Sequence, residues 1–278
     1  MSITERLKVL VKGPEGDLDL AEGALLIAKQ TYPDLDVACY LDRIEKLAAN
    51  VRAGLGKVSS STDVICRLNH YLFTEEGFEG NRENYYDPRN AFLNDVLDRK
   101  LGVPITLSIL YMEIGRRLGL PLKGVSFPGH FLVKLPTQSG EIVLDPFSGG
   151  IPLNNADLRN QLTFAYGQQH WLGVSMERML MPAGKREILI RMLRNLKSIY
   201  MQQEDWSKAL PVADTILAIL PTHPIEVKDL AQIYENLGYT KGALKNYKMY
   251  LHLLPSADDV KEIRQRVENL SRCEIRLH

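Results

Sequence analysis

The chain has 278 residues, of which 45% are apolar and 24% are charged, and its formal net charge is zero. Such values are typical of a globular protein of about two domains, and the balanced charge argues against nucleic acid or an acidic lipid surface as a partner. The three cysteines, Cys39, Cys66 and Cys273, are widely spaced, which excludes a disulfide framework and a CxxC metal site and favours the reducing cytoplasm.

Residues 1–100 are predicted to be helical, because their apolar residues recur with the period of an α-helix. Four helices are expected, over residues 17–29, 37–47, 63–73 and 87–97. Asp17 or Asp19 can cap the first of them, and Pro88 follows Asp87 at a position where a helix tolerates proline.

A further helix is predicted after Gly102, where Gly-Val-Pro precedes an amphipathic run and Leu-Gly-Leu-Pro ends it. One face of this helix is apolar and carries Leu107, Leu110, Tyr111, Ile114 and Leu118. The other face is polar and carries Glu113, Arg116 and Arg117.

The period of the apolar residues then changes to two, which predicts three short strands. They are expected over residues 122–127, 130–135 and 141–145, with a hairpin loop at 136–140. Helices followed by a small antiparallel sheet make an α+β arrangement.

Residues beyond Pro182 are predicted to be helical and contain a repeat with a constant offset of 34 residues. The segment 196–221 matches the segment 230–255, so that Tyr200 corresponds to Tyr234, Ala209 to Ala243 and Pro221 to Pro255. The constant offset favours tetratricopeptide units over two unrelated helix pairs. Residues 258–271 are expected to form a capping helix, and residues 183–278 an all-α tetratricopeptide-repeat domain.

Several kinds of site are not indicated by the sequence. The six histidines form no metal-binding spacing, and neither a complete phosphate-binding loop nor a basic-aromatic stripe is present. The N-terminal apolar run is short and interrupted by charge, which argues against a signal peptide, and no run of about 18 apolar residues predicts a membrane span. The sequence therefore implies no cofactor and no metal, and neither nucleic acid nor a membrane as a partner.

The segments "GVP", "LGLP", "GHFLVKL" and "VLDPFSGG" follow one another in an order and spacing that resemble the core of transglutaminase-like proteins. With "YYDPRNAF" and the downstream repeats, the whole chain resembles the bacterial SirB-type family, which joins a transglutaminase-like domain to tetratricopeptide repeats. The resemblance implies a papain/transglutaminase-like domain over residues 1–182, with a helical region at 1–100 and the core helix and sheet at 101–150. The resemblance also implies a link to gene regulation.

The resemblance implies roles for three residues. In the superfamily a nucleophilic cysteine stands two residues after a glycine at the start of the core helix, and in this chain that position is Pro104. His130 falls on the catalytic histidine, and Asp145 falls on the aspartate that orients it. We expect the side chains of His130 and Asp145 to lie within hydrogen-bond reach, and Pro104 to face His130 from the first turn of its helix. Because a proline cannot attack a carbonyl, the domain lacks the nucleophile of its relatives.

Other side chains near this position have both structural and functional interpretations. Thr106 and Ser108 carry hydroxyls, but structural roles are favoured for both, since a mid-helix serine usually bonds the carbonyl four residues earlier. Cys66 is expected to be a buried apolar residue of its helix. Residues 85–90 have two interpretations. They either line a ligand cleft that contains His130, or they start a helix with aromatic residues on its surface. The candidates for lining a ligand cleft are Tyr86, Asn90, Thr106, Ser108 and His130.

Two functions follow from these observations. The first is a non-catalytic protein-interaction or regulatory protein whose repeats bind a protein or peptide on their concave face. The second is an amide or ester hydrolase or an acyltransferase that uses His130 and Asp145 with water or another nucleophile. The missing cysteine favours the first function, and both leave the oligomeric state open.

Overall fold

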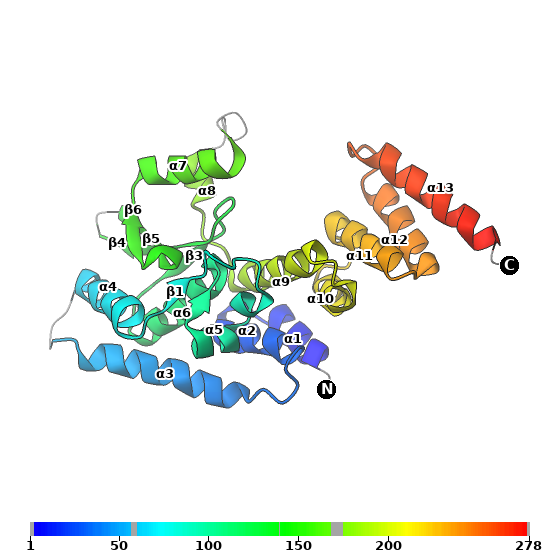
Figure 1. The fold of residues 1–278 in the computed structure, drawn as a ribbon. Coiled ribbons are helices and arrows are strands. Elements are labelled where there is room, and N and C mark those ends of the chain that lie inside the picture. The colour runs from blue at the N-terminus through cyan, green and yellow to red at the C-terminus, as the bar shows by residue number, and fades with distance from the viewer. Residues whose placement is uncertain (1–2, 57–59, 139, 168–174, 277–278) are drawn as a thin grey trace. The chain divides into compact units, whose positions relative to one another are not determined.

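The computed structural model describes residues 3–56, 60–138, 140–167 and 175–276. It divides into two compact units, residues 1–192 and residues 193–278. The first unit combines helices with a small antiparallel sheet and the second is all helical, so the predicted α+β class is confirmed (Figure 1). The division falls inside one helix, α9 (Lys185–Gln202), whereas the predicted boundary after residue 182 lies in the loop before it. None of the described helices combines the length and the apolar character that crossing a membrane requires.

The helices predicted from Asp17 or Asp19 and from Val37 begin as expected, whereas the helix predicted over residues 87–97 is divided into a short helical turn and an α-helix. Asp19 caps α2 by accepting a hydrogen bond from the Glu22 backbone N–H at 2.9 Å. The helix expected at 63–73 begins two residues earlier and becomes a π-helix after Asn69. The helices are α1 (Ile3–Lys12), α2 (Leu20–Lys29), α3 (Val37–Ala53), α4 (Ser61–Asn69), α5 (Leu93–Arg99), α6 (Pro104–Arg117), α7 (Asn155–Tyr166) and α8 (Met176–Met179), with short helical turns η1 (Glu15–Asp17), η2 (His70–Glu75), η3 (Pro88–Ala91) and η4 (Pro146–Ser148).

The sheet of the first unit has four antiparallel strands in the order β3-β4-β5-β6. Three of them were predicted, and the fourth follows the loop after Asp145. The strands are β3 (Lys123–Val125), β4 (Leu132–Thr137), β5 (Gly140–Asp145) and β6 (Ile151–Leu153). Thr137 pairs with Gly140 across the predicted hairpin, in which Ser139 lies outside the described residues. A separate parallel pair, β1 (Glu79–Gly80) and β2 (Leu101–Gly102), was not predicted.

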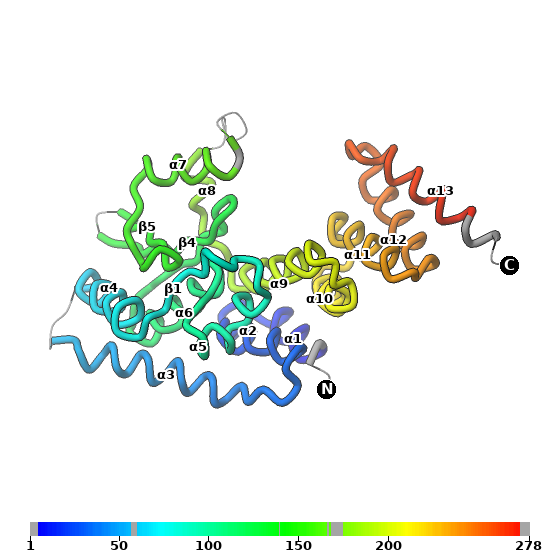
Figure 2. The backbone as a smooth tube through the Cα atoms, in the orientation of Figure 1, coloured from blue at the N-terminus to red at the C-terminus, as the bar shows by residue number. Residues whose placement is uncertain are grey.

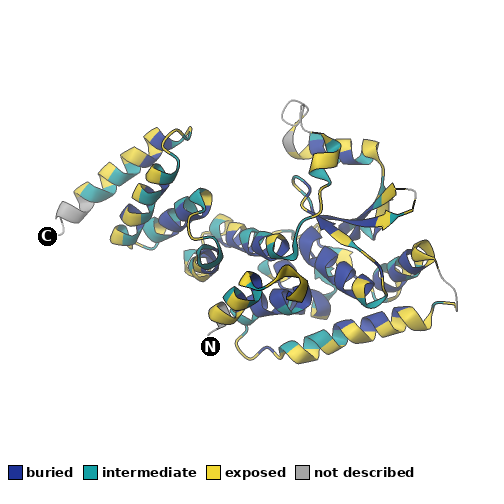
Figure 3. Cartoon of the chain, turned by 180° about the vertical axis from the view of Figure 1, so that it is seen from behind, coloured by how far each residue is buried: buried dark blue, intermediate teal, exposed yellow. Residues whose placement is uncertain are grey.

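Helix α6 forms the centre of the first unit. It contacts α2, α3 and α5 and also β3, β4 and η4, and every residue from Pro104 to Gly115 is buried. The predicted polar face was therefore wrong at Glu113, which is only 3% exposed. Its carboxylate accepts hydrogen bonds from Arg116 at 2.9 Å and from Arg117 at 2.8 Å, and these two cations make its burial tolerable. The long helix α3, by contrast, exposes one face (Figure 3).

The second unit consists of consecutive helices that pack on their neighbours in the chain, α10 on α11, α11 on α12 and α12 on α13 (Figure 2). Beyond α9 these are α10 (Trp206–Ile219), α11 (Pro224–Asn236), α12 (Thr240–Leu253) and α13 (Val260–Arg276). Ala209 and Ala243 are fully buried, as close helix packing requires. Pro221 and Pro255 lie two residues beyond the ends of α10 and α12, and α13 is the expected capping helix.

The turn after Asp145 depends on a glycine that a neighbouring side chain encloses. Gly149 and Gly150 both have positive φ, 79° and 73°. A Cβ on Gly149 would meet open space, but one on Gly150 would lie 2.2 Å from Asn69 Oδ1. Asn69 cannot move freely, because its Oδ1 accepts from the Tyr111 hydroxyl at 2.7 Å and its Nδ2 donates to the Gly150 carbonyl at 2.8 Å.

Gly149→Ala should therefore cost only the left-handed strain, about 1–2 kcal/mol. Gly150→Ala should cost about 1–3 kcal/mol more, because it also disrupts the buried hydrogen bonds of Asn69. Native-state hydrogen exchange of the α6 amides in both variants measures the difference. Equal losses of stability would show that the Asn69 contacts do not constrain this turn.

Candidate functional site

His130 lies in a tight turn that two other groups hold in place. Gly129 has a φ of 69°, which a glycine adopts without strain. The His130 backbone N–H donates to the Phe127 carbonyl at 3.1 Å. The Arg191 guanidinium donates through Nη2 to the carbonyls of Phe127 and His130, at 3.1 and 2.6 Å. The imidazole therefore projects from a backbone that is fixed from both sides.

The His130 and Asp145 side chains contact each other, at a distance inside the expected range. His130 Nε2 lies 2.9 Å from Asp145 Oδ1. An ionised carboxylate only accepts, so Nε2 carries the proton in this pair. Asp145 is 2% exposed, and its Oδ1 also accepts from the Phe147 backbone N–H at 3.0 Å. Because Nε2 is engaged, Nδ1 is the imidazole nitrogen left to act on another molecule.

The hydrogen bonds of Asp145 decide its charge state. Burial by itself raises the pKa of this carboxyl, but the hydrogen bond from His130 and the bonds from Ser148 and the Phe147 backbone outweigh burial. The pKa of Asp145 is therefore held below its usual range, and the carboxylate is ionised at neutral pH. An ionised partner favours one tautomer and one orientation of the imidazole.

Pro104 is the first residue of α6 and is buried. One turn further along the same helix face, Ser108 Oγ donates to the Phe131 carbonyl, at a long distance of 3.5 Å. This contact directs the Pro104–Ser108 face of α6 toward the start of β4, next to His130. The expected bond from Ser108 to the carbonyl four residues earlier is thus replaced by one to Phe131, the residue before β4.

The remaining cleft candidates have mainly structural contacts. Thr106 Oγ1 donates to the Asn90 carbonyl at 2.7 Å and accepts from the Val103 backbone N–H at 3.2 Å, which caps α6. Asn90 is fully buried, and its amide nitrogen donates to the carbonyls of Asn84 and Tyr85 at 2.7 and 3.3 Å.

In segment 85–90 the structure shows the helix start that one of the two open interpretations requires. Asp87 caps the short helix η3, as a helix start would require. Tyr86 is 53% exposed and packs edge-on against Tyr85. The Tyr85 ring in turn contacts Phe147, whose ring packs edge-on against the His130 imidazole at 5.9 Å.

Among the described side chains, Cys39 and Cys66 offer no replacement nucleophile in this site. Cys66 is exposed, so its predicted burial was wrong, because it lies on the outer face of α4 beside the buried Val64, Ile65 and Leu68. Cys39 is exposed in α3 and bears no contact to His130, whereas the side chain of Cys273 lies outside the described residues. Within the described ranges no three potential metal ligands gather into a site.

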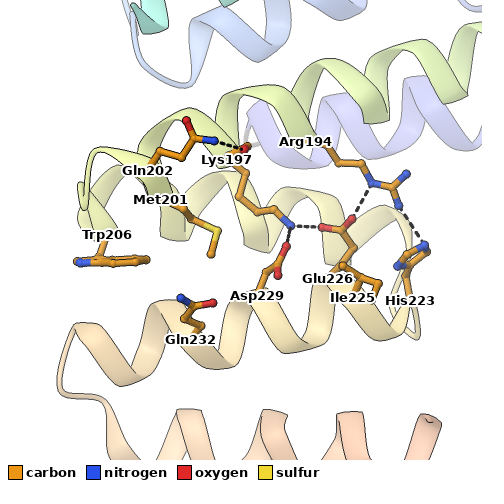
Figure 4. A pocket seen from close by; sticks show the side chains of 11 residues that line it. Arg194, Lys197, Met201, Gln202, Trp206, His223, Ile225, Glu226, Asp229 and Gln232 are labelled. Atoms are coloured by element: carbon orange, nitrogen blue, oxygen red, sulfur yellow. Dashed lines mark hydrogen bonds and ion pairs between the residues drawn. The ribbon is translucent and has the colours of Figure 1, made fainter. Parts of the chain in front are cut away.

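A groove of about 560 Å³ in the second unit was not predicted (Figure 4). Lys197, whose side chain is 5% exposed, binds both Glu226 and Asp229 there. Arg194 donates through Nε to Glu226 at 2.6 Å and through Nη2 to His223 Nε2 at 3.1 Å. Burial raises the pKa of Glu226, but Lys197 and Arg194 outweigh burial and hold that pKa below its usual range. Comparing the residues at matched positions of the two repeats reveals the charged Lys197, Glu226 and Asp229 in the first repeat. This is the sequence signal that would have indicated the groove.

Comparisons with known proteins agree with both units. A family model described as "Transglutaminase-like superfamily" matches residues 38–194, and a "Tetratricopeptide repeat" model matches residues 196–268. The chain is 41% identical to the "UPF0162 protein" of Xylella fastidiosa over 94% of its own length and 93% of the relative. It is 31% identical to the "UPF0162 protein" of Vibrio cholerae, over 94% and 96%. It is 24% identical to "Protein SirB1" of Salmonella typhimurium, over 93% and 95%.

Asp145→Asn should remove a pH-dependent contribution to stability. The native pKa of Asp145 lies below its usual value, so the carboxylate stabilises the fold above about pH 4, and this contribution is lost as pH falls through the native pKa. At pH 7 the variant should be about 1–3 kcal/mol less stable, and the difference should shrink in acid. Hydrogen exchange of β4 and β5 amides from pH 7 to pH 3 measures it. Asp34→Asn, at an exposed carboxylate, is the control; a difference that stays constant with pH would contradict the pairing.

Proposed function

This chain belongs to the transglutaminase-like superfamily, in the SirB-type form that carries tetratricopeptide repeats, and from that premise we propose that it is a non-catalytic interaction protein. One observation carries the proposal. The buried first residue of α6, the position of the superfamily's nucleophile, is Pro104, while His130 and Asp145 remain paired at 2.9 Å.

A proline at this position preserves the fold and removes the chemistry. The first residue of a helix has no intrahelical partner for its N–H, so proline fits there without loss. A cysteine at the same place would be activated by the helix N-terminus and by the adjacent imidazole. The nearby hydroxyls do not substitute for it, because Thr106 and Ser108 are fully buried and donate to the backbone carbonyls of Asn90 and Phe131.

The repeats supply the proposed interaction. Stacked helix pairs present a continuous surface that suits a protein or a peptide segment. The zero net charge supports a protein partner over nucleic acid, and the exposed thiols of Cys39 and Cys66 support a reducing cytoplasmic location. A regulatory role is part of the proposal, and the transglutaminase-like unit contributes to it a pseudoenzyme site that needs neither metal nor cofactor.

The alternative is hydrolysis by water that His130 activates. The observation that favours it is the geometry of the pair, in which an ionised Asp145 orients an imidazole that remains 15% exposed. In that mechanism His130 Nδ1 takes a proton from water as the water attacks an ester or amide carbonyl. This alternative lacks a protein side chain that acts as the nucleophile, so the attack depends on water alone.

The two functions differ in what His130→Ala does to hydrolysis. We expect the wild-type chain and His130→Ala to hydrolyse a panel of activated esters and anilides at the same background rate. General-base action of His130 would instead make the wild-type chain faster by about 10²–10⁴-fold. His70→Ala, which removes an exposed histidine, is the matched control. A loss of hydrolysis on His130→Ala but not on His70→Ala would establish the alternative.

A further inference from the structure

A cavity of about 620 Å³ lies in the first unit beside the second half of α6, and the proposed function does not involve it. Its walls come from the turn before α2, from α6, from the loop that leads into β3 and from the start of α9, all within residues 1–192. Glu113, which lines it, follows Pro104 by nine residues, or about 13 Å along the helix axis. The cavity is therefore separate from the His130 site, and its volume is that of a small-molecule site.

Buried apolar side chains form part of the cavity wall. Leu20, Met112, Leu120 and Ile188 line the cavity and have at most 7% of their surface exposed. They belong to α2, to α6, to the loop before β3 and to α9. An apolar group that enters the cavity leaves water and contacts these side chains, which favours binding.

One acceptor in the cavity lacks a donor. The Glu113 side chain is only 4% exposed. Its Oε2 accepts from Arg116 Nε and Nη2 and from Arg117 Nη1, at 3.2, 2.9 and 2.8 Å. Its Oε1 accepts no hydrogen bond from any described residue. Because a buried carboxylate oxygen is rarely left without a donor, Oε1 is the atom to which a molecule in the cavity can donate.

The cavity also offers a cation without a partner. Lys123 lines it, and the Lys123 ammonium makes no hydrogen bond or ion pair with the described part of the chain. The ammonium is carried on a flexible four-carbon stem, so it can adjust to the position of a bound carboxylate.

The charges around the cavity balance. The cations of the wall and of its ion pairs equal the carboxylates in number. The cations are Arg116, Arg117, Lys123 and Lys185, and the carboxylates are Glu15, Asp19, Glu45 and Glu113. Such a balance favours a ligand without net charge over an anion or a cation.

We propose that this cavity binds a small zwitterion with an apolar side chain, such as an apolar amino acid or a dipeptide of apolar residues. The ligand's ammonium donates to Glu113 Oε1, its carboxylate accepts from Lys123 Nζ, and its apolar side chain packs against Met112 and Ile188. A zwitterion has no net charge and supplies both the donor and the acceptor that these two groups lack. The first unit thus carries a small-molecule site in addition to the proposed interaction function of the repeats.

Isothermal titration calorimetry of the full-length chain tests the proposal, with L-leucine, L-methionine, L-phenylalanine and the dipeptide Leu-Leu as probes. We expect saturable binding of at least one of them. Two analogues of the bound probe are then compared with it, one with an amide in place of the carboxylate and one with hydrogen in place of the amine. Each analogue should bind about tenfold or more weakly, since each loses a hydrogen bond to a charged group.

Two substitutions assign the charged groups of the ligand. Lys123→Gln should weaken the binding of the probe by about tenfold or more and leave the affinity of the amide analogue unchanged. Glu113→Gln should weaken the probe likewise and leave the analogue without the amine unchanged. Lys46→Gln, which removes an exposed lysine of α3 outside the cavity, is the control and should alter none of these affinities. If Glu113→Gln does not fold, the measurements on Lys123→Gln still decide.

Saturable binding that depends on Lys123 and on both charged groups of the probe would support the proposal. The absence of binding by every probe would overturn it. Binding that Lys123→Gln leaves unchanged, or analogues that bind as tightly as the zwitterion, would also overturn it. None of these results bears on the interaction function, because the cavity lies in the first unit and that function is assigned to the repeats.

Discussion

The burial of α6 from Pro104 to Gly115 is the constraint on which the first unit depends. A helical segment with no solvent-facing side must have each of its polar side chains satisfied by a neighbour. Glu113 is bound by two arginines, Tyr111 donates to Asn69, and Ser108 donates to the Phe131 carbonyl just before β4. The Glu113 contacts lie within α6, the Tyr111 contact joins it to α4, and the Ser108 contact joins it to the segment that carries His130. The same burial explains why the first residue of α6 must suit a helix start, a requirement that Pro104 meets as well as a cysteine does.

The His130–Asp145 pair is present, and in the function proposed here the nucleophile that it would serve is replaced by Pro104. In the first unit such a pair positions an imidazole, orders the loop after β5 and holds a buried carboxylate in its ionised form. None of these effects requires catalysis. The pair is therefore compatible with a unit that has kept a scaffold while the repeats carry the interaction. In the repeats, Lys197 and Glu226 are charged, whereas the residues 34 positions later, Ala231 and Val260, are apolar and buried.

The sequence predicted the elements whose signals are local. The start of α6 at Pro104, the two strands beside His130 and Asp145 and the 34-residue repeat all follow from period, caps and turns. Among the features that were missed, two illustrate the role of tertiary contacts. Glu113 was assigned to a polar face because periodicity does not register the helices α2 and α3 that pack on α6, although its partners Arg116 and Arg117 are close in the sequence. The groove at Lys197 was missed because it forms only when α9 and α11 come together.

The central claim is that Pro104 occupies the place of a nucleophile next to an oriented imidazole, and a thiol placed there tests it most directly. Because the position is buried, the pH dependence of iodoacetamide alkylation at Pro104→Cys, mapped by peptide mass, is more informative than its rate. The account predicts a thiol pKa between about 3.5 and 7.5, well below the usual value near 8.5, and a return toward that value when His130→Ala is added. A thiol that titrates near its usual value with and without His130 would contradict the account.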